Sequence, residues 1–130
     1  MRFTPAQFEI IARRYVNSQY VGKWAYSFID DRVFRSHFKL CSVGVARLWQ
    51  RLEEICDACV YHSGMDSPLP FKACRPEHLL LALHMLKTYC SVPVGAKFFG
   101  ISEKTHRRYF WAMVHYLKHL AKCTVSTLVV

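Results

Sequence analysis

A glycine and a serine divide the run FFGISEKTHRRYFWAMVHYL, residues 98–117, into two stretches with apolar patterning. Gly100 suits the end of a helix, because glycine adopts the left-handed backbone conformation without the steric penalty that other residues meet. Ser102 suits the start of the next helix, because its hydroxyl can accept a hydrogen bond from a backbone N–H that the first turn leaves unpaired. The spacing therefore predicts two helices joined by a tight turn.

Helix signals also occur in the rest of the chain. Thr4 is expected to cap a first helix, Pro5 suits its first position, and Gln7 completes a capping box. Further helices are expected over residues 27–38, with Ser42 as a cap, from Pro76, and with Ser91 as a cap. The helix from Pro76 is apolar almost all round, which predicts that it lies buried in the centre of the fold.

No segment shows the two-residue alternation that is typical of a half-buried strand. The sequence therefore predicts an all-α fold, a domain of five or six helices containing a helix-turn-helix at residues 92–121. We expect four parts along the chain. They are an N-terminal helical part with helices 1 to 3 (1–60), a Gly-, Pro- and Ser-rich loop (61–75), the helix-turn-helix DNA-binding part (76–122) and a tail (123–130). The apolar tail is open to three interpretations: an edge strand, a docked tail, or the cut end of a longer protein.

A weak internal repeat links the two helical parts. When HFKLCSVGVARLWQRL is aligned with FFGISEKTHRRYFWAMV, Phe38 meets Phe99 and Arg47 meets Arg108. Both segments then have a short helix, a tight turn and a longer helix. Chance matching of apolar residues is the alternative interpretation. If the repeat is real, the first copy is a degenerate helix-turn-helix that is less basic and serves packing more than DNA contact.

The net positive charge of the chain is concentrated in residues 71–130. Residues 1–70 carry nine Lys and Arg against seven Asp and Glu, whereas residues 71–130 carry nine against two. This asymmetry favours an anionic partner, with nucleic acid first and a membrane surface second. The alternative is that the charge serves only solubility. The longest apolar run is too short to span a bilayer and the N-terminus lacks a signal-peptide pattern, so we expect an intracellular protein with no membrane partner.

The last predicted helix has an apolar side and a basic side. Spacings of three and four predict an apolar stripe of His106, Phe110, Met113, Leu117 and Leu120, which anchors the helix on the core. The first turns of the opposite side carry the cations that a recognition helix presents to base edges and phosphates. The candidate DNA-binding residues are Lys97, Ser102, Lys104, Thr105, Arg107, Arg108 and Trp111.

Roles within this set follow from side-chain chemistry. At least one of Arg107 and Arg108 is expected to read a base, because the arginine fork bonds guanine in bidentate fashion. Lys97 and Lys104 are expected to contact phosphates. The alternative interpretation is an ordinary solvated basic face on a bundle helix.

The six cysteines favour buried thiols in a reducing compartment over a metal site. Cys56 and Cys59 form the one CxxC pair, and their spacing places both on the inner face of a helix. Structural zinc is the minor alternative. The acidic residues Glu53, Glu54 and Asp57 are interpreted as a solvated face. No histidine has an acid or nucleophile at a recognisable spacing, so we expect no cofactor, no metal, no catalytic residue and no enzymatic activity, a small Cys/His hydrolase being the remote alternative.

Three segments in a fixed order carry a resemblance to a known family. They are FRSHF followed by LWQRL, then RPEHLLLALHMLKTY, and then FFGISEKTHRRYFWAMV. Together these segments, over residues 30–120, resemble the N-terminal DNA-binding region of DDE-superfamily transposases of the Harbinger type. Two positions depart from that pattern. Lys39 stands where the family often has glycine, and His106 stands at a normally apolar site.

The resemblance implies a transposase-derived helix-turn-helix that binds specific double-stranded DNA in the nucleus. In that family catalysis belongs to a separate domain, so a C-terminal catalytic domain or a separate transposase subunit is the implied protein partner. The alternative function is a helical protein–protein interaction module without DNA binding, whose aromatic surface would comprise Trp24, Tyr26 and Trp111.

Overall fold

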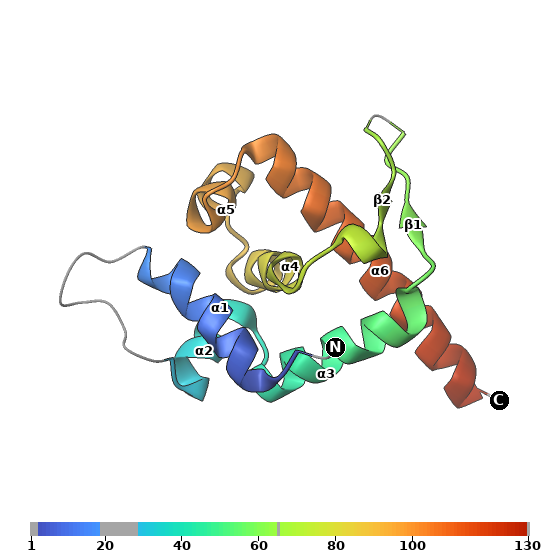
Figure 1. Cartoon of the computed structure of the whole chain (residues 1–130), viewed down its shortest axis with the longest axis horizontal. Coiled ribbons are helices and arrows are strands. Elements are labelled where there is room, and N and C mark those ends of the chain that lie inside the picture. The colour runs from blue at the N-terminus through green and yellow to red at the C-terminus, as the bar shows by residue number, and fades with distance from the viewer. Residues whose placement is uncertain (1–2, 19–28, 65, 130) are drawn as a thin grey trace.

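The computed structural model describes residues 3–18, 29–64 and 66–129, the last five of these by their backbone only. The elements in chain order are α1 (Pro5–Asn17), α2 (Asp31–Phe38), α3 (Ser42–Cys56), β1 (Val60–Tyr61), β2 (Leu69–Pro70), the 3-10 helix η2 (Phe71–Ala73), α4 (Pro76–Thr88), α5 (Val92–Phe99) and α6 (Glu103–Val129). Six α-helices thus make up most of the described part of the chain, which confirms the predicted all-α fold (Figure 1).

The predicted helix starts hold with two shifts, the first of which is that the helix predicted over residues 27–38 begins as α2 at Asp31, after the cap Asp30. The Thr4 hydroxyl accepts a hydrogen bond from the Gln7 N–H at 3.2 Å, and the Gln7 side chain accepts one from the Thr4 N–H at 2.7 Å, which completes the capping box. Ser42 is not the cap of α3, as predicted, but its first residue, and it is buried. Cys41 takes the capping position, and its sulfur accepts a hydrogen bond from the Gly44 N–H at 3.4 Å.

The turn between α5 and α6 forms as the sequence predicts. Gly100 has φ of 67°. The N–H of Gly100 bonds the carbonyl of Lys97 at 3.2 Å, and the N–H of Ile101 bonds the carbonyl of Ala96 at 3.0 Å. This pattern is a Schellman motif, which closes α5 by satisfying carbonyls that the helix end leaves unpaired. The Ser102 hydroxyl then caps α6 by accepting a hydrogen bond from the Thr105 N–H at 3.1 Å.

Two successive three-helix units follow the same local plan. Both α1 and α4 have 13 residues and begin with proline, and both α2 and α5 have 8 residues. A residue with positive φ comes directly after α2 and α5, Lys39 at 73° and Gly100 at 67°. The long helix of each unit begins three residues after that residue. The two segments aligned by pairing Phe38 with Phe99 thus share a short helix, a residue with positive φ and a longer helix, although the hydrogen bonds of the two turns differ.

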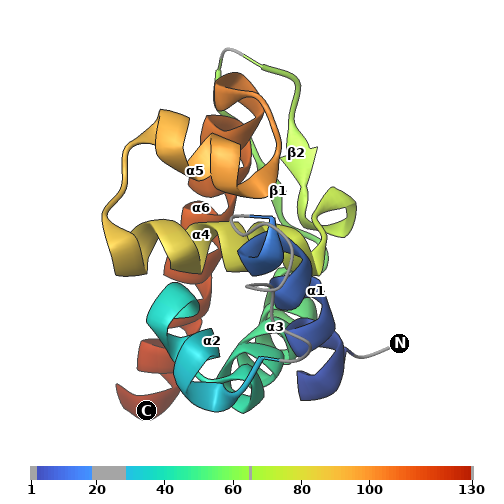
Figure 2. The same ribbon diagram turned by 90° about the vertical axis from the view of Figure 1, so that its left-hand side faces the viewer.

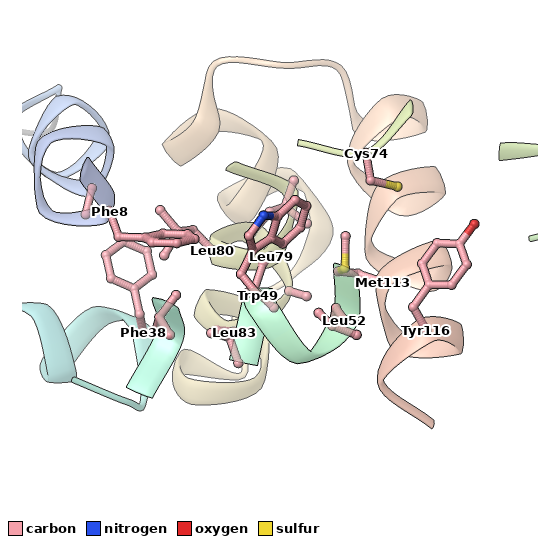
Figure 3. Close-up of a cluster of buried hydrophobic side chains, with 14 of the residues drawn as sticks. Phe8, Phe38, Trp49, Leu52, Cys74, Leu79, Leu80, Leu83, Met113 and Tyr116 are labelled. Carbon is pink, nitrogen blue, oxygen red and sulfur yellow. The ribbon is translucent and has the colours of Figure 1, made fainter. Parts of the chain in front are cut away.

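The two units share one core, and α4 lies at its centre. Six consecutive residues of α4, from Leu79 to His84, are buried. This helix contacts α1, α2, α5 and α6, and Figure 2 shows it crossing the middle of the molecule. The buried cluster in Figure 3 joins Phe8 and Phe38 of the first unit to Leu80 and Met113 of the second. The predicted N-terminal part is thus packed against the predicted DNA-binding part.

Two segments differ from prediction. The segment predicted as a loop, 61–75, contributes to a small antiparallel hairpin in which Val60 pairs with Pro70 and Tyr61 with Leu69, and it continues into η2. Strands of two residues are too short to show an alternation in the sequence. The predicted tail, 123–130, continues α6 as far as Val129. Thr124 illustrates how a β-branched residue is accommodated there, since its hydroxyl donates to the carbonyl of Leu120 at 2.9 Å.

Two buried histidines lie where α5 packs on the other helices. His84 of α4 is 4% exposed, and its ring stacks on Phe98 at 4.1 Å and faces His37 at 6.5 Å. His106 of α6 is fully buried, and a Cβ added at Gly95 would lie 2.6 Å from its Nε2. The side chain that the sequence flags as unusual is thus packed against a glycine of α5, and only a glycine leaves it room.

We expect Gly100→Val to destabilise the protein by about 1–2 kcal/mol. No atom would contact the new Cβ, so the cost comes from placing a β-branched residue in the left-handed conformation. The matched control is Gly44→Ala, at a glycine inside α3 whose φ is negative and whose added Cβ would meet ordinary contacts at 3.5 Å or more. Urea denaturation measures the free energy of unfolding of both variants and the parent. Equal stability of Gly100→Val and the parent would contradict the strained turn.

Acid should weaken the fold through His84. Burial, helped by the charges of His37 and His106, lowers the pKa of His84 to about 4. The unfolded chain takes up this proton near pH 6.5, so the contribution of neutral His84 is complete above that pH and is lost as pH falls toward 4. At pH 5 the loss amounts to about 2 kcal/mol.

The measurement is urea denaturation at pH 7.5 and pH 5.0. His84→Leu should reduce the difference in unfolding free energy between the two pH values. The control His62→Gln, at an exposed histidine, should leave that difference unchanged. A pH dependence that is identical in His84→Leu and the parent would refute this assignment.

Candidate nucleic-acid interface

One long face of α6 is exposed and basic. The exposed residues repeat at spacings of three and four, which places them along one side of the helix. They are Lys104, Arg107, Trp111, His115, Lys118 and Lys122. We call these six side chains the basic face. It covers more than four turns of α6, so it is longer than the group of cations that the sequence analysis singled out.

The opposite side of α6 is anchored in the core. His106, Met113 and Leu120 are buried as predicted, while Phe110 and Leu117 are only half-buried. The stripe is shifted round the helix, because Ala112 and Tyr116, which the prediction left out, are fully buried. Tyr116 contacts the hairpin through its hydroxyl, and this contact draws its side of the helix inward.

The β1–β2 hairpin lies along one edge of the basic face. The Tyr116 hydroxyl accepts a hydrogen bond from the Tyr61 N–H at 3.0 Å and donates one to the carbonyl of Leu69. The ring of Phe71 meets Tyr116 edge-on at 5.3 Å. Burial raises the pKa of Tyr116 to about 12, so its hydroxyl stays protonated and able to donate. A single buried tyrosine therefore holds both strands against α6.

Two shallow grooves adjoin each other between the hairpin and α6. The first is lined by Tyr61, Ser63, Asp66, Lys104, Arg107, Arg108 and Trp111. The second is lined by Tyr61, Trp111, Val114, His115, Lys118, His119 and Lys122. Tyr61 and Trp111 line both grooves, so these two aromatic side chains mark the junction. The two grooves together follow the basic face from its first turn to Lys122.

The hairpin engages two of the predicted DNA-binding side chains. The Lys104 ammonium lies 3.7 Å from the carboxylate of Asp66. The Arg108 guanidinium donates to the Ser67 carbonyl at 3.1 Å and to the Ser67 hydroxyl at 3.3 Å. Arg108 is half-buried, whereas Arg107 is exposed. Of the two arginines expected to read a base, Arg107 is therefore the one positioned to reach a ligand.

Of the other predicted residues, Ser102 and Thr105 lie at the start of α6 and Lys97 lies on a separate surface. Ser102 and Thr105 bond each other at the start of α6, with the Ser102 hydroxyl donating to that of Thr105 at 2.8 Å. Lys97 is exposed on α5 and lines a different groove together with Arg14. The structure thus brings together Lys104, Arg107 and Trp111, and it does not bring Lys97 to their groove.

Several residues of this surface were missed by the sequence analysis. The sequence could have indicated Lys118, His119 and Lys122, because positions seven, eight and eleven residues after Trp111 return to about the same side of a helix. Tyr61 and Asp66 had no signal, because the hairpin that positions them depends on the contact with Tyr116, which lies 55 residues further along the chain than Tyr61.

Lysine and histidine side chains gather in the second groove. The pKa of His115 lies below its ordinary value, first because of burial and then because of the positive charges of His119, Lys118, His62 and Lys122. Cations that disfavour a further proton favour an anion at the same place. Phosphate groups are the anions that a linear array of this kind fits.

No group of three or more His, Cys, Asp or Glu side chains in the part of the chain that the structure describes is arranged to hold a metal ion. Burial and then the neighbouring Cys59 raise the pKa of the Cys56 thiol to about 12, which disfavours the thiolate that zinc requires. Cys59 lies beyond the end of α3 rather than inside it, contrary to expectation.

None of the described helices combines the length and apolarity needed to cross a membrane.

Comparison with protein-family models, with curated proteins and with solved structures found no match to this chain. The similarity to the transposase region therefore stays a prediction that rests on the quoted motifs.

Tyr116→Phe should release the hairpin without unfolding the protein. The variant loses the hydrogen bonds to the Tyr61 N–H and the Leu69 carbonyl, at a cost of about 1–3 kcal/mol for each group left unsatisfied. Hydrogen–deuterium exchange should rise in residues 60–70 and stay unchanged in α4. The control Tyr109→Phe removes a hydroxyl from the same helix and should leave exchange in the hairpin as it is. Uniformly faster exchange in the Tyr116 variant would show that the bonds support the whole fold instead.

Proposed function

We propose that the protein binds duplex DNA through the basic face of α6. The observation that carries the proposal is the placement of Lys104, Arg107, Lys118 and Lys122 on the exposed side of a single helix whose other side is buried. A helix presented in this way fits the width of a major groove. Between Lys104 and Lys122 the helix rises about 27 Å, so its cations reach phosphates well beyond the bases it contacts.

The two ends of the basic face have different parts in this proposal. Arg107 lies in the first turns of α6, where recognition helices contact base edges, and its fork suits guanine. Lys118 and Lys122 lie in later turns, where point charges meet phosphates. Arg108 positions the hairpin rather than reading a base. This arrangement revises the sequence-based roles, in which Arg108 and Lys97 were candidates for direct contact.

Asp66 opposes binding in the same groove. Its carboxylate lies 3.7 Å from the Lys104 ammonium, where a DNA phosphate would otherwise pair with that lysine. Binding therefore exchanges one anion for another at Lys104. The chain acts as a binder and not as an enzyme in this proposal. Its derivation from a transposase and its place in the nucleus rest on the sequence resemblance alone.

A protein-interaction module is the second candidate, and the observation that favours it is Trp111, which is 54% exposed. The other aromatic residues of the predicted docking surface, Trp24 and Tyr26, lie outside the residues that the structure describes. The two functions differ in their salt dependence. Phosphate contacts weaken steeply as salt rises, whereas an aromatic docking surface does not.

Fluorescence anisotropy with a labelled duplex library, titrated with salt, tests the proposal. Arg107→Ala should weaken binding to the preferred sequence by about 1–3 kcal/mol and relax the preference at one base pair. Lys118→Ala should weaken all sequences alike and lower the salt slope by about one. Asp66→Asn should strengthen binding, because it removes the competing carboxylate.

The matched control is Lys87→Ala, which removes one positive charge from an exposed site on α4, away from the basic face. It should leave affinity close to that of the parent. If Arg107→Ala/Lys118→Ala, still folded by circular dichroism, binds DNA as tightly as the parent, the basic face is solvated surface and the proposal fails.

A further inference from the structure

The junction of the two grooves holds a pair of aromatic side chains among cations. Trp111 is 54% exposed, although Lys104 and Arg107 precede it and Lys118 and Lys122 follow it on the same face of α6. Tyr61 approaches from the hairpin and is half-buried. Both residues line the groove that contains Arg107 and the groove that contains Lys118. Any strand that follows the cations from one groove to the other must pass these two rings.

Neighbouring side chains brace both rings. The Phe110 ring meets Trp111 edge-on, with centroids 5.1 Å apart and planes at 73°. The His115 ring lies 5.3 Å from Tyr61, and its neighbour Tyr116 bonds the Tyr61 backbone. A braced ring loses little conformational freedom when a ligand stacks on it. The junction is therefore a prepared surface rather than two loose side chains.

Paired bases cannot use such a surface. Inside a duplex each base face is covered by its neighbours, so an aromatic ring that lies against the grooves meets only base edges and sugars. An unpaired base has a free π-face, and stacking on an aromatic side chain, with cations along the backbone, is the usual way in which proteins hold single strands. The chemistry of the junction thus fits an unpaired nucleotide, and the chemistry of the first groove fits the duplex beside it.

We propose that Trp111 and Tyr61 stack an unpaired base, so that the preferred ligand is DNA in which a duplex continues into a single strand. The inference rests on the proposed function, because it places the duplex on the same basic face. Lys104 and Arg107 then hold the duplex side of the boundary. Lys118 and Lys122, which contact duplex phosphates when the ligand is blunt, follow the phosphates of the single strand along the second groove when the ligand is tailed. Acidic protein segments offer charge but no ring to stack, so they fit this junction less well.

The test compares three ligands of matched sequence on the full chain: a blunt duplex, the same duplex with a six-nucleotide unpaired tail, and the tail strand alone. The parent should bind the tailed duplex about 5- to 150-fold more tightly than the blunt one, the range expected for stacking one base. 2-Aminopurine at the first unpaired position should lose fluorescence on binding, since stacking quenches it.

Trp111→Ala separates stacking from charge. It should weaken binding of the tailed duplex about 5- to 150-fold more than binding of the blunt duplex, so that the preference for the tail is lost, and it should leave 2-aminopurine unquenched. Trp111→Phe, which keeps a ring, should retain part of the preference for the tail and part of the 2-aminopurine quenching. The control Tyr89→Ala removes an aromatic residue that is 84% exposed in the turn between α4 and α5, and it should change neither quantity.

Each contrary result has its own meaning. Equal affinity of the parent for tailed and blunt duplexes overturns this inference and leaves duplex binding standing. A Trp111→Ala variant that weakens both ligands equally also overturns it, because Trp111 is then a general contact. A parent that binds none of the three ligands overturns the proposed function itself. A parent that binds an acidic peptide such as polyglutamate more tightly than the tailed duplex, and loses this in Trp111→Ala, makes the junction a protein-docking surface.

Discussion

The rest of the structure depends on the burial of α4 on all sides. A helix whose six consecutive residues Leu79 to His84 are buried cannot exist beside water, so other helices must cover it. α1 and α2 approach from the first three-helix unit and α5 and α6 from the second. The two units are thus tied into one core, and α6 is fixed along one side. That fixed position is what allows a single exposed face of α6 to act as a defined surface.

The two units share a backbone plan but present different surfaces. In the alignment that pairs Phe38 with Phe99, Lys104 of α6 corresponds to Val43 of α3, and both are exposed. Further along α3, Arg51 pairs with Glu54 at 2.9 Å, so the cation there is neutralised within its own helix. The two units thus share a helical scaffold, but α3 carries two arginines against two glutamates, whereas α6 carries five Lys and Arg against one glutamate. This division agrees with a first copy that serves packing more than ligand contact.

Local features of the fold could be predicted from the sequence, and long-range ones could not. Thr4 and Gly100 act through hydrogen bonds and backbone angles within a few residues, so their signals are complete in a short stretch of chain. The hairpin has no such signal, because its strands are two residues long and are held by Tyr116 from α6. A contact between segments far apart in the sequence also explains the position of Arg108. This arginine has the sequence pattern of a recognition residue, yet Ser67 accepts its hydrogen bonds from a segment 41 residues earlier.

The hairpin also explains how so basic a face is stable without a ligand. Like charges along one side of a helix repel one another, and the cost grows where burial lowers the local dielectric. Asp66 offsets part of it at Lys104, and the Ser67 carbonyl and hydroxyl do so at Arg108. The contact at Lys104 is one that a phosphate oxygen can replace, because it is a single ion pair whose lysine is exposed. The contact at Arg108 has two hydrogen bonds to Ser67, so it is harder to replace. In the proposed complex, a phosphate takes the place that the Asp66 carboxylate holds beside Lys104 in the free molecule.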